Sequence, residues 1–144
     1  MDVPEPGGHP AVLVSDRQAL DLDEPALIAL ATRTLEGEGI GAGAELSVSF
    51  VDEAEIEDLH VRYMDEPGPT DVLSFVQDDG DGVLGDVVIC PSVAARNNPE
   101  DPAAELRLLL VHGILHLLGH DHEVAEEKAA MWAKQERYSG VAAP

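Results

Sequence analysis

A chain of 144 residues, 44% of them apolar, is long enough to bury one hydrophobic core without disulfides. Its formal net charge of -21 should repel polyanions such as nucleic acids, unless the few bases gather at one site or metal ions intervene. The N-terminus lacks a signal-peptide pattern, no apolar run reaches the roughly 18 to 20 residues of a membrane span, and the single Cys90 forms no internal disulfide. We expect a cytoplasmic protein with a disordered lead at 1–10 and one domain at 11–140.

The first half of the chain contains two predicted strands, each followed by a predicted helix. In residues 45–51 apolar and polar residues alternate, which is the period-two pattern of a strand with one buried face. Asp52 and Glu55 form a helix-capping pair, and an acidic residue before Pro25 marks an earlier helix start. These signals predict elements at 11–16, about 24–35, 45–51 and about 53–64.

The middle of the chain predicts a β-hairpin. The turn-forming stretch 65–69 precedes a short strand at 71–76. The polar tip 77–82 then joins this strand to a second apolar run at 83–89. Two short apolar runs joined by such a turn indicate antiparallel pairing.

Two helices are predicted in the last third of the chain. Asp101 and Pro102 suit the cap and first turn of a helix at 103–118, which is apolar on nearly every side and is therefore expected at the buried centre. An amphipathic helix is expected at 123–138. Its predicted core contacts are Val124, Ala125, Met131 and Trp132.

Four of the six histidines fall between His112 and His122. On a helix, His112 and His116 lie one turn apart on the same face and can bind one metal ion. His120 would rise about 12 Å above His112 on an unbroken helix, too far to share a zinc ion that needs nitrogens at about 2.1 Å. Gly119 can adopt the left-handed conformation that ends a helix and lets His122 turn back. We therefore predict one zinc ion (Zn²⁺) bound by His112, His116 and His122.

Three imidazoles leave one tetrahedral position for water, which is typical of a catalytic zinc site. The spacing also matches the metzincin pattern H-E-x-x-H-x-x-G-x-x-H, but Gly113 replaces the glutamate that serves those proteases as general base. A zinc protease is therefore the weaker alternative. Asp86 is a candidate base only if it lies near the metal, and the catalytic residues stay unknown.

The segments HGILHLLGHDH, PTDVLSF and GDVVIC together resemble the YbeY family of bacterial rRNA maturation endoribonucleases, over roughly residues 44–135. The resemblance implies an α+β fold, with a small mixed β-sheet packed against several helices and the metal-binding histidines on the buried central helix. It implies a zinc-dependent, single-strand-specific endoribonuclease in small-subunit rRNA maturation and ribosome quality control. The implied partners are single-stranded rRNA, ribosomal particles, and ribosomal or GTPase partner proteins, with no membrane.

Two positions depart from the family pattern. Many members place an arginine implicated in activity directly after the tyrosine that aligns with Tyr63, whereas this chain has Met64. A lysine usual two residues later aligns with Glu66, which reverses the charge beside the presumed RNA groove. Arg62 could substitute, although a position two residues away on a helix points about 160° away.

A different class of function stays open. In this alternative, the protein is a ribosome-associated factor with a structural zinc and little catalysis, favoured by the missing arginine and the strong acidity. An open fourth coordination position beside a groove would indicate an enzyme, and a fourth protein ligand a structural site. Several residues fit either a role in the cleft or metal site, or ordinary turn chemistry. They are Thr70, Asp71, Ser74 and Asp121.

Overall fold

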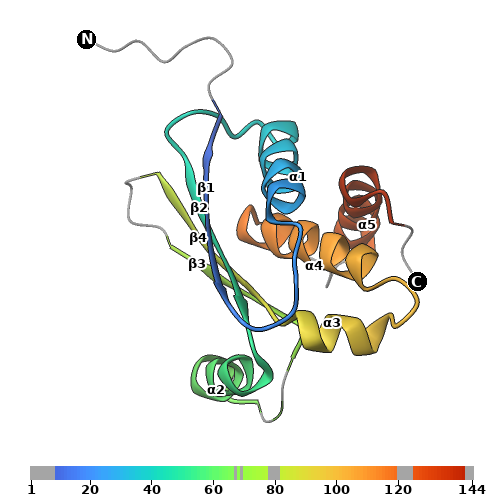
Figure 1. Cartoon of the computed structure of the whole chain (residues 1–144). Coiled ribbons are helices and arrows are strands. Elements are labelled where there is room, and N and C mark those ends of the chain that lie inside the picture. Colours follow the sequence, from blue (N-terminus) through green and yellow to red (C-terminus); the bar gives the residue numbers. More distant parts are fainter. Residues whose placement is uncertain (1–8, 67, 69, 78–81, 120–124, 142–144) are drawn as a thin grey trace.

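The computed structural model describes residues 9–66, 68, 70–77, 82–119 and 125–141. Within these ranges the chain forms one four-stranded sheet and five helices (Figure 1). In chain order the elements are β1 (Ala11–Arg17), α1 (Glu24–Gly37), β2 (Glu45–Val51), α2 (Glu53–Met64), β3 (Val72–Val76), β4 (Val83–Ile89), α3 (Pro91–Asn97), α4 (Pro102–Leu117) and α5 (Ala125–Ser139).

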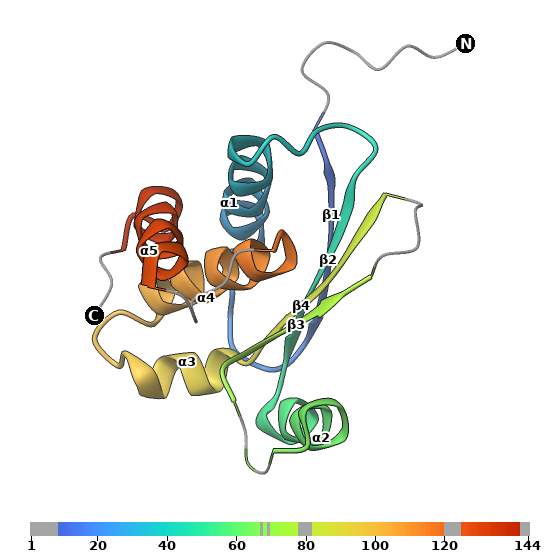
Figure 2. The same cartoon turned by 180° about the vertical axis from the view of Figure 1, so that it is seen from behind.

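The sheet is mixed, with strand order β1-β2-β4-β3. Strands β1, β2 and β4 are parallel, and β3 pairs antiparallel with β4 from Val72 opposite Ile89 to Val76 opposite Gly85. The predicted hairpin is therefore confirmed. Figures 1 and 2 show α1, α4 and α5 gathered on one side of the sheet, with α2 near one end. This arrangement is the predicted α+β class.

Helix α4 lies at the centre of the main core, as its all-round apolar composition predicts. Asp101 caps it by accepting a hydrogen bond from the Ala104 backbone at 3.1 Å, and Pro102 occupies the first turn, where a missing N–H costs nothing. Its fully buried side chains pack with those of α1, β2 and β4. The fully buried residues of this core include Leu30, Leu35, Leu46, Phe50, Ile89, Leu110, Ile114 and Leu115.

A smaller core joins α2 to the other face of the sheet. Asp52 accepts from the Glu55 backbone at 2.8 Å, so the predicted capping pair starts α2. Ile56 belongs to this core together with Leu73 of β3, Val88 of β4 and Cys90. The free Cys90 thiol is buried, and this burial raises its pKa. None of the helices within the described ranges combines the length and apolarity needed to cross a membrane.

The structure also differs from the sequence predictions. Helix α3 was not predicted, because a helix of seven residues that begins at Pro91 without a side-chain cap shows no helical period. In α5, Met131 is buried as predicted, whereas Trp132 is only partly buried. The other two predicted core contacts of this helix, and the lead at residues 1–8, lie outside the residues whose side chains are described.

Candidate functional site

Helix α4 presents His112 and His116 on one face, as their spacing predicts. Their ring centroids lie 4.6 Å apart with an interplanar angle of 71°, an edge-to-face arrangement. Both rings line a hollow of about 340 Å³ beside β3, which we call the histidine hollow. Its other lining residues are Met64, Val72, Leu73, Ser74 and Val76.

Gly113 explains why the histidines lie so close to β3. A Cβ atom at this position would lie 2.6 Å from Val87 Cγ1 and 3.2 Å from Ser74 Oγ, so only glycine lets α4 pack this closely. The Ser74 hydroxyl donates to the Gly113 carbonyl at 3.0 Å and fixes the contact. A side chain at position 113 would point towards the sheet. A metzincin-like glutamate therefore has no space here, and no glutamate is among the described residues that line the histidine hollow. The protease alternative gains no support from this site.

Gly119 ends the histidine helix in the predicted way. Its φ is +94°, in the left-handed region, and its N–H bonds to the His116 carbonyl at 3.0 Å. His120, Asp121 and His122 lie outside the described residues, so the third ligand stays a prediction. Among the described residues, no group of three or more His, Cys, Asp or Glu side chains could hold a metal ion.

Gln135 of α5 contacts the site and was not predicted. Its Oε1 lies 2.8 Å from His112 Nδ1, and the side chain is only 2% exposed. One sequence signal existed, because Gln135 follows the buried Met131 by four residues and so lies on the apolar face of α5. A glutamine on that face needs a buried partner, but its partner on another helix cannot be read from the local pattern.

The end of α2 brings Met64, not Arg62, to the histidine hollow. Met64 lines the hollow, whereas Arg62 forms an exposed ion pair with Asp58 at 3.0 Å on the surface of the same helix. The hypothesis that Arg62 replaces the family arginine is therefore wrong. Glu66 instead pairs with His60 Nε2 at 3.1 Å, and His60 Nδ1 donates to the Gly68 carbonyl at 2.9 Å.

The three predicted cleft residues have different surroundings. Ser74 lines the histidine hollow, as the resemblance implies. Asp71 joins β3 to α3, because its carbonyl accepts from the Cys90 backbone at 3.0 Å and its carboxylate accepts from Asn97 at 3.3 Å. Thr70 is partly buried just before β3. Only Ser74 therefore combines a site position with a hydrogen bond to the histidine helix.

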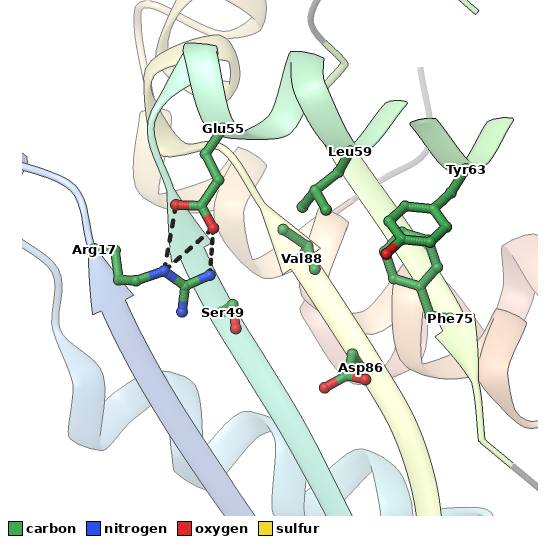
Figure 3. Close-up of a pocket in the computed structure, with 8 residues that line it drawn as sticks. All are labelled: Arg17, Ser49, Glu55, Leu59, Tyr63, Phe75, Asp86 and Val88. Atoms are coloured by element: carbon green, nitrogen blue, oxygen red, sulfur yellow. Dashed lines mark hydrogen bonds and ion pairs between the residues drawn. The ribbon is translucent and has the colours of Figure 1, made fainter. Parts of the chain in front are cut away.

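A second hollow lies on the opposite side of β3, and we call it the sheet groove (Figure 3). It has a volume of about 380 Å³. Within it, the Arg17 guanidinium donates from both Nε and Nη2 to the Glu55 carboxylate, with an Nη2–Oε2 distance of 2.5 Å. The Tyr63 and Phe75 rings pack edge-to-face, with their centroids 5.4 Å apart. The lining residues are Arg17, Ser49, Glu55, Leu59, Tyr63, Phe75, Asp86 and Val88.

Asp86 belongs to this groove and not to the histidine site. Its neighbour Val87 packs towards Gly113 of α4, and successive strand residues point to opposite faces, so Asp86 points away from the histidines. The hypothesis of Asp86 as a base beside the metal is therefore wrong.

The mixed sheet packed against helices defines a small α+β protein, and its central helix carries two adjacent histidines at a hollow. Sequence comparison identifies the particular family: residues 14–141 match the family described as Endoribonuclease YbeY, and the chain belongs to that family. The resemblance inferred from the motifs is thus confirmed. The predicted class of enzyme, a nuclease among the hydrolases, is confirmed at the level of the family.

Relatives named Endoribonuclease YbeY match most of the chain. The Streptomyces coelicolor protein is 43% identical over 138 residues, covering 85% of this chain and 84% of the relative. The Frankia alni protein is 46% identical over 144 residues, with 88% and 80% covered. The solution structure of TM1509 from Thermotoga maritima has a TM-score of 0.59 at 30% identity and covers 89% of this chain and 86% of that one. The comparison supports the α+β fold.

Proposed function

We propose that this protein is a single-strand-specific, zinc-dependent endoribonuclease of the cytoplasm, acting in small-subunit rRNA maturation and ribosome quality control. The observation that carries the proposal is the pair of adjacent imidazoles of His112 and His116 lining an open hollow. The names of the family and of its relatives support cleavage of RNA as the reaction.

The residues at the hollow fit a zinc ion. A carbonyl oxygen can only accept, so the contact from Gln135 Oε1 places the proton of a neutral His112 on Nδ1 and the lone pair on Nε2. This is the form in which imidazole binds metals. The left-handed Gly119 ends α4 directly after the two histidines, which supports the proposal of His122 as the third ligand. When bound, zinc would polarise a phosphoryl oxygen or lower the pKa of a water molecule.

The size of the hollow suits part of a single strand. Its volume of about 340 Å³ is near the lower end of the range for small-ligand pockets, so it admits part of one extended chain. A duplex would have to present its groove and backbone to a broad surface instead. Met64 and Val72 offer apolar contact to a base, and the Ser74 hydroxyl lies beside them.

Charge predicts that the protein does not act alone. No lysine or arginine is among the described residues that line the histidine hollow, and the whole chain carries a formal charge of -21. RNA phosphates therefore need the metal ion and positive charge from elsewhere. We accordingly propose that the partners are single-stranded rRNA within ribosomal particles, together with basic surfaces of ribosomal or GTPase partner proteins.

The test is cleavage of a labelled single-stranded rRNA fragment by purified protein at stated salt. Wild type is compared with His116→Ala and with the matched control His9→Ala, since His9 is exposed and contacts Glu36 away from the hollow. Zinc content is measured in all three proteins. We expect His116→Ala to fold but to lose zinc and cleavage, and the control to keep both. Equal cleavage by wild type and His116→Ala would show that the activity is a contaminant.

One observation favours a second function, a ribosome-associated factor with a structural zinc. Met64 lies at the hollow where many relatives are expected to carry an arginine, so a phosphate contact is missing. In that case wild type binds one zinc ion tightly and binds small ribosomal subunits but does not cut RNA. Adding ribosomal particles to the cleavage assay separates this outcome from the absence of a required partner.

A further inference from the structure

A glutamine buried in a core is costly unless its amide is satisfied. Gln135 is 2% exposed and lies on the same face of α5 as Met131, which is 1% exposed. An apolar residue there would avoid the cost of desolvating an amide, which the hydrogen bond to His112 offsets. The amide therefore has a partner-specific role beyond filling space.

Contacts with α1 and α4 fix the position of helix α5, and with it the Gln135 amide. Glu38, at the end of α1, accepts hydrogen bonds from Lys134 at 2.9 Å and from the Tyr138 hydroxyl at 2.7 Å. From α4, Arg107 donates to the Ser139 carbonyl at 3.3 Å. These contacts lie on both sides of Gln135 along α5. The acceptor is thus placed by the packing of three helices.

On these grounds we propose that Gln135 is a positioning residue for the metal ligand His112. It holds the ring with the proton on Nδ1, so that Nε2 is the atom that binds the ion, and it fixes the ring orientation. The inference rests on the proposed zinc site. Loss of a hydrogen-bonded partner of a metal ligand typically lowers metal affinity by about 10- to 100-fold.

Three variants separate this role from packing. Gln135→Met keeps the volume but removes the acceptor, and we expect zinc affinity to fall by about 10- to 100-fold. Gln135→Glu keeps an acceptor and should restore affinity to at least half the wild-type value. Lys134→Met removes one of the contacts that hold α5, while Tyr138 and Arg107 still hold the helix on the C-terminal side of Gln135. It should lower thermal stability slightly and leave zinc affinity within about twofold.

Zinc affinity is measured by competition with a chromophoric chelator, using folded protein freed of metal. A second readout needs no metal: nitrogen NMR of the histidine rings, at a pH where they are neutral, reports which nitrogen carries the proton. We expect the Nδ1–H form of His112 in wild type and Gln135→Glu, and a mixture dominated by Nε2–H in Gln135→Met.

The outcomes distinguish the positioning role of Gln135 from the zinc site itself. If wild type binds zinc tightly and Gln135→Met binds it equally well with an unchanged tautomer, the positioning role is overturned and the zinc site stands. If Lys134→Met loses as much affinity as Gln135→Met, the effect is one of helix packing and the proposal also fails. If wild type itself binds no zinc, the proposed function falls first and the positioning role falls with it.

Discussion

Strand β3 separates two hollows of similar size whose polar groups are held in different ways. In the sheet groove, Arg17 and Glu55 neutralise each other, and their ion pair joins β1 to α2 (Figure 3). In the histidine hollow, His112 and His116 are held by an amide and by each other. The larger hollow thus carries a structural ion pair and the smaller one carries groups suited to bind metal. Their volumes do not distinguish them, whereas the chemistry of their polar groups does.

The strongest test of this contrast compares His112→Ala with Asp86→Asn. Removing a zinc ligand should lower zinc affinity and RNA cleavage by more than the roughly 100-fold upper limit for an outer partner. Asp86 lies in the sheet groove, so Asp86→Asn should leave both within about twofold. Zinc competition and the cleavage assay measure the pair. A large loss of zinc affinity in Asp86→Asn would contradict the assignment of Asp86 to a hollow that is separate from the metal site.

The next test pushes α4 away from β4 and β3. Because a Cβ at position 113 would lie 2.6 Å from Val87, Gly113→Ala should lower the free energy of unfolding by about 1–3 kcal/mol and weaken zinc binding. Urea unfolding of the metal-free protein measures the stability. Gly41→Ala is the matched control, since no atom lies within 4 Å of a Cβ there. Equal destabilisation of both variants would mean that the tight helix–strand contact is not the cause.

The third test introduces a cation beside the histidine hollow. Met64→Arg places a guanidinium at the hollow and should strengthen RNA binding several-fold, with about one additional phosphate contact in the salt dependence. Val61→Arg adds the same charge on an exposed part of α2 that does not line the hollow. RNA binding is titrated at several salt concentrations. If both variants gain equally, the gain reflects net charge and not the site.

The smallest expected effect concerns Glu105 of α4, which lines neither hollow. Burial raises the pKa of its carboxyl, and Asp71 adds to the rise. A raised folded-state pKa means that ionisation destabilises the fold: the penalty is absent below the unfolded pKa of about 4.3 and complete above the folded one. Glu105→Gln should therefore gain less than about 0.5 kcal/mol at pH 7 and nothing at pH 4.

Thermal unfolding of the metal-free protein at the two pH values measures this difference. The control is Glu100→Gln, because Glu100 is exposed. A Glu105→Gln gain that is equal at pH 4 and pH 7 would contradict the assignment to ionisation. Zinc affinity should be unchanged in both variants.

Sequence patterns predicted the features that depend on local chemistry. The caps at Asp52 and Asp101, the hairpin, the shared face of His112 and His116 and the helix end at Gly119 follow from residue type and period. What escaped prediction is either too short to show a period or depends on packing between distant segments. Helix α3 is too short to show a period, and the Gln135 contact joins residues 23 positions apart on two helices. The face on which Asp86 lies required the strand register.

The contact between Glu38 and Tyr138 has a consequence for the order of folding. It joins residues 100 positions apart, so its formation closes a long loop, and loop closure costs entropy before the contact is made. The apolar α1–sheet–α4 core does not need that contact to begin to form. We therefore expect α5 to be the last helix to gain amide protection in pulsed hydrogen exchange. The histidine helix would then be in place before the glutamine that orients it.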